Sequence, residues 1–289
     1  MIIFHDPSCA EYGSHLRPEQ PARITRSVAH LQPAHPAWEW RRPPIADEAV
    51  LLTAHTPALL KRLQQPGDID DDTPHFPGIY DHARRAVGAA LAATGAAQAG
   101  QKAFSLMRPP GHHCTRQQAM GFCYLNQIAI ATLHTAASGR RVAVWDFDAH
   151  HGNGTEDILN HRPGLLFTSV HQYPGYPGTG TSSTDNCKNF PVKPHCPREE
   201  HMTVLARSWE AVLSFNPDLV LVSAGFDAYA RDPITEMTLE AADFAELGQW
   251  LRQAGRPAAA ILEGGYSPDL PVLIDAFLSA WEKQTPSSV

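Results

Sequence analysis

Two carboxylates and an imidazole follow a short apolar run at alternating positions. Val142–Trp145 is an apolar β-type segment, and Asp146, Asp148 and His150 come directly after it. In an extended chain, residues two apart point to the same side, so these three side chains are expected to converge along one face. A carboxylate and an imidazole held together are typical ligands of a divalent metal ion. The pattern therefore predicts most of a metal site, which needs one more ligand from another segment.

Asp227 is the expected third ligand. It follows the apolar run Leu219–Ser223, where a buried carboxylate without a partner would be costly. Taken alone, this residue could equally be a helix N-cap or a loop carboxylate. Two carboxylates and one imidazole leave the fourth position of a tetrahedral Zn²⁺ open to water, as in catalytic rather than structural zinc sites. The same ligands also suit Fe²⁺.

Groups that could transfer protons follow two other apolar runs. His112 and His113 come after Arg108-Pro-Pro-Gly, whose prolines stiffen the loop, so the pair could supply a general base and acid near the metal. Two loop histidines without any catalytic role would give the same pattern. Tyr266 follows two glycines, which permit a close backbone approach, and its phenol could donate to a developing oxyanion. By itself the Gly-Gly-Tyr motif is a weak signal.

These groups need a framework that brings the ends of several strands together. Apolar β-branched runs alternate with helical patterns, which indicates an α/β fold with a mostly parallel sheet. In such sheets ligands bind outside the carboxyl ends of the strands, where each polar cluster falls. The Pro-rich stretches Trp40–Pro44 and Gln65–Pro77 are expected to be loops. The expected strands are Met1–Phe4, Ala103–Met107, Val142–Trp145, Leu165–Val170, Leu219–Ser223 and Ala258–Leu262, and the expected helices are Tyr80–Ala99, Asn126–Ala137, Glu199–Ser214 and Leu239–Ala254.

Length and composition narrow the class of protein. The 289 residues, 43% of them hydrophobic, are expected to form a single domain, residues 1–289. No apolar run approaches the roughly 20 residues that span a bilayer, and the N-terminus does not read as a secretory signal, so no membrane association is expected. Five cysteines without a CxxC pair favour a reducing cytoplasm. A net charge of −7 without a Lys/Arg cluster argues against nucleic-acid binding. The oligomeric state is left open.

Six motifs stand in order along the chain: Arg108–His113, Gly121–Asn126, Asp146–Thr155, Pro177–Gly180, Ser223–Ala228 and Leu262–Tyr266. With these motifs the chain resembles, from about Asp72 to Tyr266, the zinc-dependent histone deacetylase family, in particular its class II-like and bacterial acetylpolyamine amidohydrolase branches. The resemblance implies an arginase/deacetylase-type three-layer α/β fold with helices on both faces of a mostly parallel sheet. It also implies hydrolysis of the amide of an acylated amine, with acetyl-lysine in proteins or peptides as the expected substrate.

The resemblance assigns metal ligands. The positions that bind Zn²⁺ in the family are Asp148, His150 and Asp227 in this chain. The family also holds a structural monovalent cation, usually K⁺. Its ligands here would be Asp146, Asp148 and Ser169, together with backbone carbonyl groups.

The resemblance also assigns the proton-transfer groups. His112 and His113 would be the catalytic histidine pair, with His113 as the proton shuttle. Asp146 would orient His112, and Asn153 would face His113. Asparagine at that position is similar to class II members, and a neutral partner should leave His113 less basic than an aspartate would. Tyr266 would polarise the substrate carbonyl.

Substrate-binding positions are implied in the same way. Phe122, which follows Gly121, and Tyr176 would flank a narrow tunnel for the acylated amine. Asp72 is similar to a rim aspartate that binds substrate backbone amides, although a solvated acidic turn would look the same. Ile234 stands where polyamine-selective relatives have a glutamate, which argues against strict polyamine specificity.

Three alternatives stay open. An acetylpolyamine or other small-molecule amidohydrolase is the first, since Glu236 lies near Ile234 and Arg231 replaces a usual glycine at the tunnel mouth. An arginase-like ureohydrolase is the second, but its two-metal site needs carboxylates where this chain has Gly152 and Tyr229. A catalytically silent acyl-lysine-binding module is the third, and the presence of every expected catalytic group argues against it.

Overall fold

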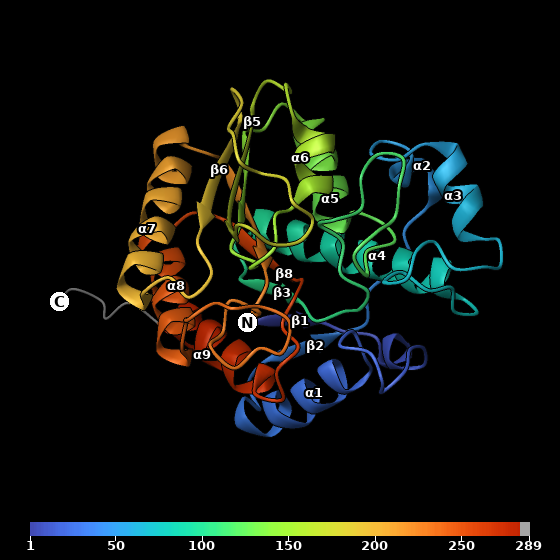
Figure 1. The fold of residues 1–289 in the computed structure, drawn as a ribbon, viewed down its shortest axis with the longest axis horizontal. Helices are drawn as coiled ribbons and strands as arrows, with labels where there is room; N and C mark the ends of the chain where they lie inside the picture. The colour runs from blue at the N-terminus through green and yellow to red at the C-terminus, as the bar shows by residue number, and fades with distance from the viewer. Residues whose placement is uncertain (284–289) are drawn as a thin grey trace.

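A wholly parallel sheet lies at the centre of the protein (Figure 1). The computed structural model describes residues 1–283. Within them the strands are β1 Ile2–Phe4, β2 Glu39–Arg41, β3 Ala103–Ser105, β4 Val142–Asp146, β5 Leu165–Gln172, β6 Cys187–Val192, β7 Leu219–Ala224 and β8 Ala258–Leu262. Their order across the sheet is β2-β1-β3-β8-β7-β4-β5-β6, and every neighbouring pair runs parallel.

Helices cover both faces of this sheet, which gives three layers (Figure 1). Their bounds are η1 Pro7–Ala10 (a 3₁₀ helix), α1 Ala22–Ala34, α2 Glu48–Leu51, α3 Pro57–Leu63, α4 Ile79–Gln98, α5 Gln127–Ala136, α6 Asn153–Leu159, α7 Arg198–Phe215, α8 Ala241–Ala254 and α9 Leu270–Glu282. α4, α5 and α6 lie on one face, and α1, α7, α8 and α9 lie on the other. The predicted three-layer α/β fold is therefore confirmed.

The central strands are apolar because both of their faces are covered. Every residue of β4, β7 and β8 is buried, as expected for parallel strands between two helical layers. Trp145 of β4 packs against Trp209 of α7 and Trp250 of α8, with ring centroids 4.6 and 6.3 Å apart. Its indole nitrogen donates to the Ser208 hydroxyl at 3.0 Å, so the polar atom of this large side chain is also satisfied. This packing fixes the carboxyl end of β4, from which the chain continues into the predicted metal ligands.

The expected elements are present with shifts of a few residues at their ends, but the edges of the sheet differ from the prediction. Trp40 and Arg41 were expected in a loop and instead belong to β2, which pairs with β1 in the register Ile3↔Trp40. β6 was not predicted, nor were α1, α6 and α9. Both edge strands lack a clear apolar pattern, and β6 contains Pro191, which an edge strand tolerates because one side needs no partner.

The carboxyl ends of the strands meet along one edge of the sheet, and the predicted polar clusters lie there. β4 and β7 are direct neighbours with Asp146 opposite Ser223, so the loops after these two strands start side by side. β8 pairs with β7 and β3 pairs with β8, which brings the loops that carry Tyr266 and the histidine pair to the same edge. No helix within residues 1–283 is both long and apolar enough to cross a membrane.

Candidate active site

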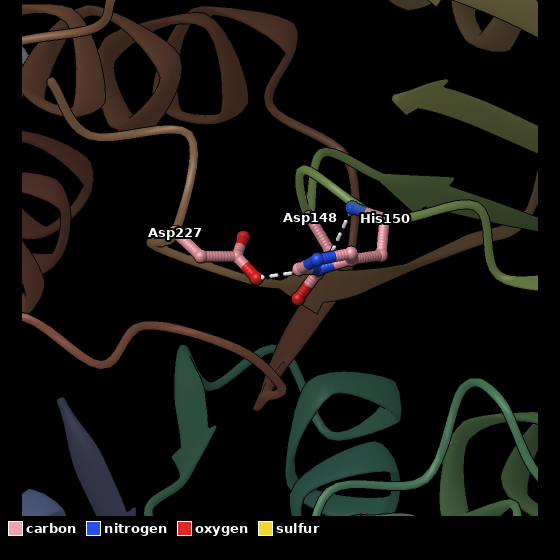
Figure 2. Close-up of side chains that lie close together, drawn as sticks. All are labelled: Asp148, His150 and Asp227. Carbon is pink, nitrogen blue, oxygen red and sulfur yellow. Dashed lines mark hydrogen bonds and ion pairs between the residues drawn. The ribbon is translucent and has the colours of Figure 1, made fainter. Parts of the chain in front are cut away.

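Asp148, His150 and Asp227 converge at this edge (Figure 2). Each offers one ligand atom, and these atoms lie within 4.8 Å of one another. His150 Nδ1 lies 2.9 Å from Asp227 Oδ2 and 3.2 Å from Asp148 Oδ1. The loops after β4 and β7 thus bring together the three residues that the sequence predicted as metal ligands.

The backbone that achieves this differs from the one expected. β4 ends at Asp146 and the chain bends over the next residues, so strand alternation does not align Asp148 and His150. Instead Asp146 Oδ1 accepts the Asp148 N–H at 3.1 Å, and Asp148 Oδ1 accepts the His150 N–H at 2.9 Å. Each carboxylate bonds the amide two residues ahead, a local turn that short acidic side chains favour. The side chains converge as expected. The prediction that an extended strand would align them was wrong, because the strand ends at Asp146.

The donor set fits a divalent metal ion. Asp148 and Asp227 are fully buried, and within residues 1–283 neither forms an ion pair with a lysine or arginine. Their other oxygens accept backbone N–H groups, of Gly264 at 2.7 Å and of Ala149 at 2.8 Å, which orients both carboxylates. Two buried carboxylates facing one imidazole need a positive charge, and oxygen and nitrogen donors suit Zn²⁺ or Fe²⁺.

The electrostatics of the triad are those of three coupled groups. Burial, together with the charge of Asp148, raises the pKa of Asp227 above its ordinary value. Burial also tends to raise the pKa of Asp148, but the neighbouring His112 and His150 outweigh burial and hold this pKa below its ordinary range. For His150, burial lowers the pKa, while Asp227 and Asp148 outweigh burial and raise it to about 10. The two carboxylates therefore create a site that favours a cation.

The histidine pair lies beside the triad in two contrasting environments. His112 Nδ1 donates to Asp146 Oδ2 at 3.1 Å, whereas His113 Nδ1 donates to the amide oxygen of Asn153 at 2.8 Å. Burial alone would lower the pKa of His112, but Asp148 and Asp146 raise it to about 10. Burial and the neighbouring His112 lower the pKa of His113 well below its ordinary value. One ring of the pair thus tends to be charged and the other neutral.

Tyr266 approaches the same site from the loop after β8. Its ring packs edge-on against Phe122, with centroids 5.7 Å apart, and the Arg23 guanidinium lies 4.7 Å from its ring centroid. Burial raises the pKa of the phenol well above its ordinary value, so the hydroxyl stays protonated and can donate. Arg23 also donates to the Gly265 carbonyl at 2.7 Å, which anchors the segment before Tyr266.

A cavity of about 260 Å³ opens from these groups to the surface. Its walls contain His113, His150 and Tyr266. They also contain all five predicted substrate-binding residues, which are Asp72, Gly121, Phe122, Tyr176 and Ile234, and two residues that were not predicted, Arg17 and Pro18. The Tyr176 ring stands edge-on to His113 with centroids 5.0 Å apart. The cavity is therefore lined by aromatic side chains and leads down to the histidines.

Gly121 shows how narrow this wall is. It has a φ of +56°, and a Cβ there would lie 2.7 Å from a ring carbon of His113 and 2.9 Å from the ring of Tyr176. A side chain at this position would displace one of the two rings, and the left-handed backbone also favours glycine. Glycine at position 121 thus allows the backbone to pass close to the rings of both His113 and Tyr176.

Ser169 lies where a second cation site was expected. It faces Asp146 in the register of β4 and β5, and its hydroxyl lies 2.9 Å from His171 Nδ1. Asp146 itself is fully buried and bonded to both His112 and the Asp148 amide. Asp146 thus lies between Ser169, opposite it in the sheet, and Asp148, whose N–H it accepts, and a K⁺ ion held by these three residues stays a prediction.

The sequence did not indicate several buried groups around the site. Arg108 donates to both oxygens of Glu19, and Arg23 joins Glu19 to the Tyr266 segment. Glu263 Oε2 accepts the N–H groups of Gly111 and His112 at 2.6 and 3.1 Å, so it holds the loop of the histidine pair. Of these groups, only Arg108 and Glu263 directly follow apolar runs, and nothing in those runs indicates which partners they have.

Comparisons with known proteins agree on one family. The family model described as "Histone deacetylase domain" matches residues 17–280. A probable deacetylase of Methanothermobacter thermautotrophicus is 34% identical, over 93% of this chain and 86% of the relative. The crystal structure of the HDA15 HD domain superposes with a TM-score of 0.90 at 27% identity, covering 98% of this chain and 91% of that one. An acetylpolyamine aminohydrolase from Burkholderia pseudomallei gives a TM-score of 0.88 at 25% identity, covering 97% and 98%.

Proposed function

This chain belongs to the histone deacetylase family, and on that premise we propose that it is a metal-dependent deacylase. Its reaction is the hydrolysis of the amide of an acylated amine, with acetyl-lysine in proteins or peptides as the main substrate. The observation that carries the proposal is that His113, His150 and Tyr266 line one cavity, next to the carboxylates of Asp148 and Asp227. Relatives named as deacetylases and amidohydrolases support hydrolase activity.

Asp148, His150 and Asp227 would hold a Zn²⁺ ion, or Fe²⁺ in its place. When bound, such an ion supplies Lewis acidity that polarises a carbonyl group and lowers the pKa of a water molecule. Asp146, Asp148 and Ser169 would hold a structural K⁺ ion with backbone carbonyl oxygens. The carboxylates are already oriented by backbone N–H groups, so little rearrangement would be needed.

His113 acts as the general base and then as the general acid. Because its Nδ1 donates to the Asn153 amide oxygen, the lone pair is on Nε2, the nitrogen that is free to accept a proton. Its lowered pKa keeps the ring neutral before the reaction. After taking a proton from water, the ring returns one to the departing amine, and such proton transfer is worth on the order of 10²–10⁴ in rate.

His112 has a supporting role. Asp146 fixes the orientation of its ring and favours its charged form, and the ring centroids of His112 and His113 are 4.1 Å apart. A positive charge at this distance helps to keep His113 unprotonated at rest. His112 therefore sets the proton affinity of its neighbour.

Tyr266 polarises the carbonyl of the substrate. Its protonated hydroxyl donates to the oxygen, on which negative charge develops during attack. The aromatic walls, Phe122 and Tyr176, exclude water from the stem of the acylated amine. Asp72 at the rim would accept backbone N–H groups of a peptide substrate.

A small acetylated amine is the second candidate, because the rim is acidic. Asp72 lines the cavity and lies in one turn with Asp70 and Asp71, while Arg17, which also lines the cavity, donates to the Asp71 backbone carbonyl. These carboxylates would attract the distal cation of an acetylpolyamine. Ile234 in the cavity wall offers no such charge, which favours the peptide.

Kinetic profiling of the purified protein tests both candidates. The panel contains acetyl-lysine peptides, acetylpolyamines and lysine peptides with longer acyl chains, each measured with and without a hydroxamate inhibitor. We expect the highest kcat/KM on acetyl-lysine peptides, with inhibition by the hydroxamate. Higher kcat/KM on acetylpolyamines would replace the first candidate by the second, and tight hydroxamate binding without any turnover would indicate a silent binding module.

A further inference from the structure

Asp232 is a buried carboxylate whose hydrogen-bond partners are backbone amides. It follows β7 and is 7% exposed. Its Oδ2 accepts the N–H groups of Tyr266 at 2.7 Å and Ser267 at 3.2 Å, and its Oδ1 accepts that of Ile234 at 3.2 Å. Within residues 1–283 it forms no ion pair with a basic side chain. A carboxylate buried in this way is costly, and burial raises its pKa to about 7.

The segment before Tyr266 cannot fix this tyrosine through side chains of its own. A Cβ at Gly264 would lie 2.2 Å from Asp227 Oδ2, so a side chain there would collide with a proposed metal ligand. Gly265 has a φ of +116°, a conformation that glycine adopts readily. Two consecutive glycines leave the backbone free to move, so hydrogen bonds from other loops must hold it.

Those bonds divide the segment between different partners. Asp148 accepts the Gly264 N–H, and Arg23 donates to the Gly265 carbonyl. The amides of Tyr266 and Ser267, by contrast, both bond to one oxygen of Asp232. The loop after β7 therefore holds Tyr266 at its own backbone.

We infer that Asp232 is a positioning residue for Tyr266, which acts by fixing the backbone from which the phenol reaches the cavity. This inference rests on the proposed role of Tyr266 as the donor to the substrate carbonyl. A donor of this kind works only when it is already in place, and a displacement of about 1 Å can cost roughly 100-fold in rate. The role of Asp232 should therefore appear in kcat more than in KM.

A double-mutant cycle separates positioning from general damage. We expect Asp232→Ala to lower kcat by about 10- to 100-fold, with KM changed less than threefold and the metal content unchanged. In a Tyr266→Phe background the same substitution should lower kcat less than twofold, because the hydroxyl that it positions is absent. An equal loss in both backgrounds would show that Asp232 does not act through Tyr266.

Asp232→Asn gives the conservative comparison and replaces the alanine variant in the cycle if that variant does not fold. Its amide oxygen can still accept the two N–H groups, so we expect more than a third of the wild-type kcat. A loss as large as that of alanine would overturn the inference. Asp243→Ala is the matched control: this carboxylate is also buried and accepts the Glu240 N–H, but it caps α8 away from the cavity. That variant should lose thermal stability and keep kcat.

Amide hydrogen exchange provides a measurement that does not require turnover. In Asp232→Ala, the peptide that contains Tyr266 and Ser267 should exchange at least tenfold faster, while the peptide that contains β4 should be unchanged. Unchanged exchange at Tyr266 would refute the inference even if the enzyme is active. Absence of wild-type turnover on every acylated amine would instead refute the proposed function, and the exchange result would still decide whether Asp232 holds this backbone.

Discussion

At the scale of single residues, the contrast between His112 and His113 is the property that organises the chemistry. Adjacent in sequence, they bond to a carboxylate and to a neutral amide, respectively. The carboxylate favours the charged form of His112, whereas burial and the charge of His112 outweigh the Asn153 hydrogen bond and favour the neutral form of His113. The partner of His113 is therefore one of several groups that set its basicity, and it is the one that a single atom, oxygen in place of nitrogen, would change from neutral to charged.

Asn153→Asp tests this contrast. A carboxylate facing His113 Nδ1 should raise the pKa of His113, typically by about one unit or more. The base must be neutral to accept a proton, so a higher pKa moves the acidic limb of the kcat/KM profile to higher pH. The measurement is the pH profile of wild type and variant on the same peptide. An acidic limb that stays in place would mean that Asn153 does not control the base.

Tyr266→Phe tests the carbonyl donor. Removing one hydroxyl that donates to a developing oxyanion costs roughly 10²–10³ in kcat. The ring contact with Phe122 remains, so we expect the fold and the metal content to be kept. Turnover and bound metal are measured on the same preparation. Wild-type turnover in the variant would remove Tyr266 from the mechanism.

The sequence predicted the candidate residues that the structure brings together, because their types are unusual at the ends of apolar runs. Asp148, His150 and Asp227 could be found in this way. Asp232 and Glu263 could not be found, since their partners are backbone N–H groups from loops distant in sequence, and every residue other than proline offers such a group. Roles that depend on backbone contacts need the folded chain.

At the scale of elements, the loop of the histidine pair is tied to the start of α5 by one buried histidine. Asn126 caps α5 by accepting the Ala129 N–H at 3.0 Å, and its own N–H donates to His55 Nε2 at 2.9 Å. The other nitrogen, His55 Nδ1, donates to the Thr115 carbonyl at 3.0 Å. This arrangement requires a neutral ring, because Nε2 must accept. His55 therefore joins three segments in its uncharged form.

Protonation of His55 should weaken the fold. Burial lowers the pKa of His55 to about 4, below the value of about 6.5 expected in the unfolded chain. Its contribution is therefore complete above pH 6.5 and is lost as the pH falls toward 4, up to about 3 kcal/mol. Denaturant unfolding of wild type and His55→Gln at several pH values measures this. The free energies of unfolding of wild type and variant should become more similar as the pH falls from 6.5 toward 4. A difference between them that does not change with pH would contradict the prediction.

Elements inside the sheet could be predicted better than those at its edges. β4, β7 and β8 are covered on both faces and therefore read as apolar runs. β2 and β6 each have one neighbouring strand and many partly exposed side chains, so their composition resembles that of loops. Their strand character comes from pairing with β1 and β5, which no local pattern records.

At the scale of the whole molecule, the candidate site is assembled from strand ends that only the complete sheet brings together. The candidate metal ligands come from the loops after β4 and β7, Tyr266 comes after β8, and the histidine pair comes after β3. Because these loops are far apart in the sequence, the site can form only when the sheet has formed, and a ligand bound at the site should in turn stabilise the sheet. A single domain and a cytoplasmic location stay predictions.

Metal removal should consequently affect stability as well as activity. An ion that binds the folded chain alone contributes about 3 kcal/mol when its free concentration is 100 times its Kd. We expect a chelator to abolish turnover and lower Tm, and Zn²⁺ or Fe²⁺ to restore both. Asp227→Asn, which lacks one ligand charge, should show a smaller Tm response to added metal. A Tm independent of chelator and of metal would contradict the assigned site.

The order of strands in the sheet also bears on how the protein folds. β4 lies beside β7, although α6, β5, β6 and α7 come between them in the chain. Before these two strands pair, an ion can meet only Asp148 and His150 of the three candidate ligands, so we expect the complete site to form late in folding. Contacts that form after the folding barrier slow unfolding and leave the folding rate unchanged. Metal should therefore prolong the lifetime of the native state without making refolding faster.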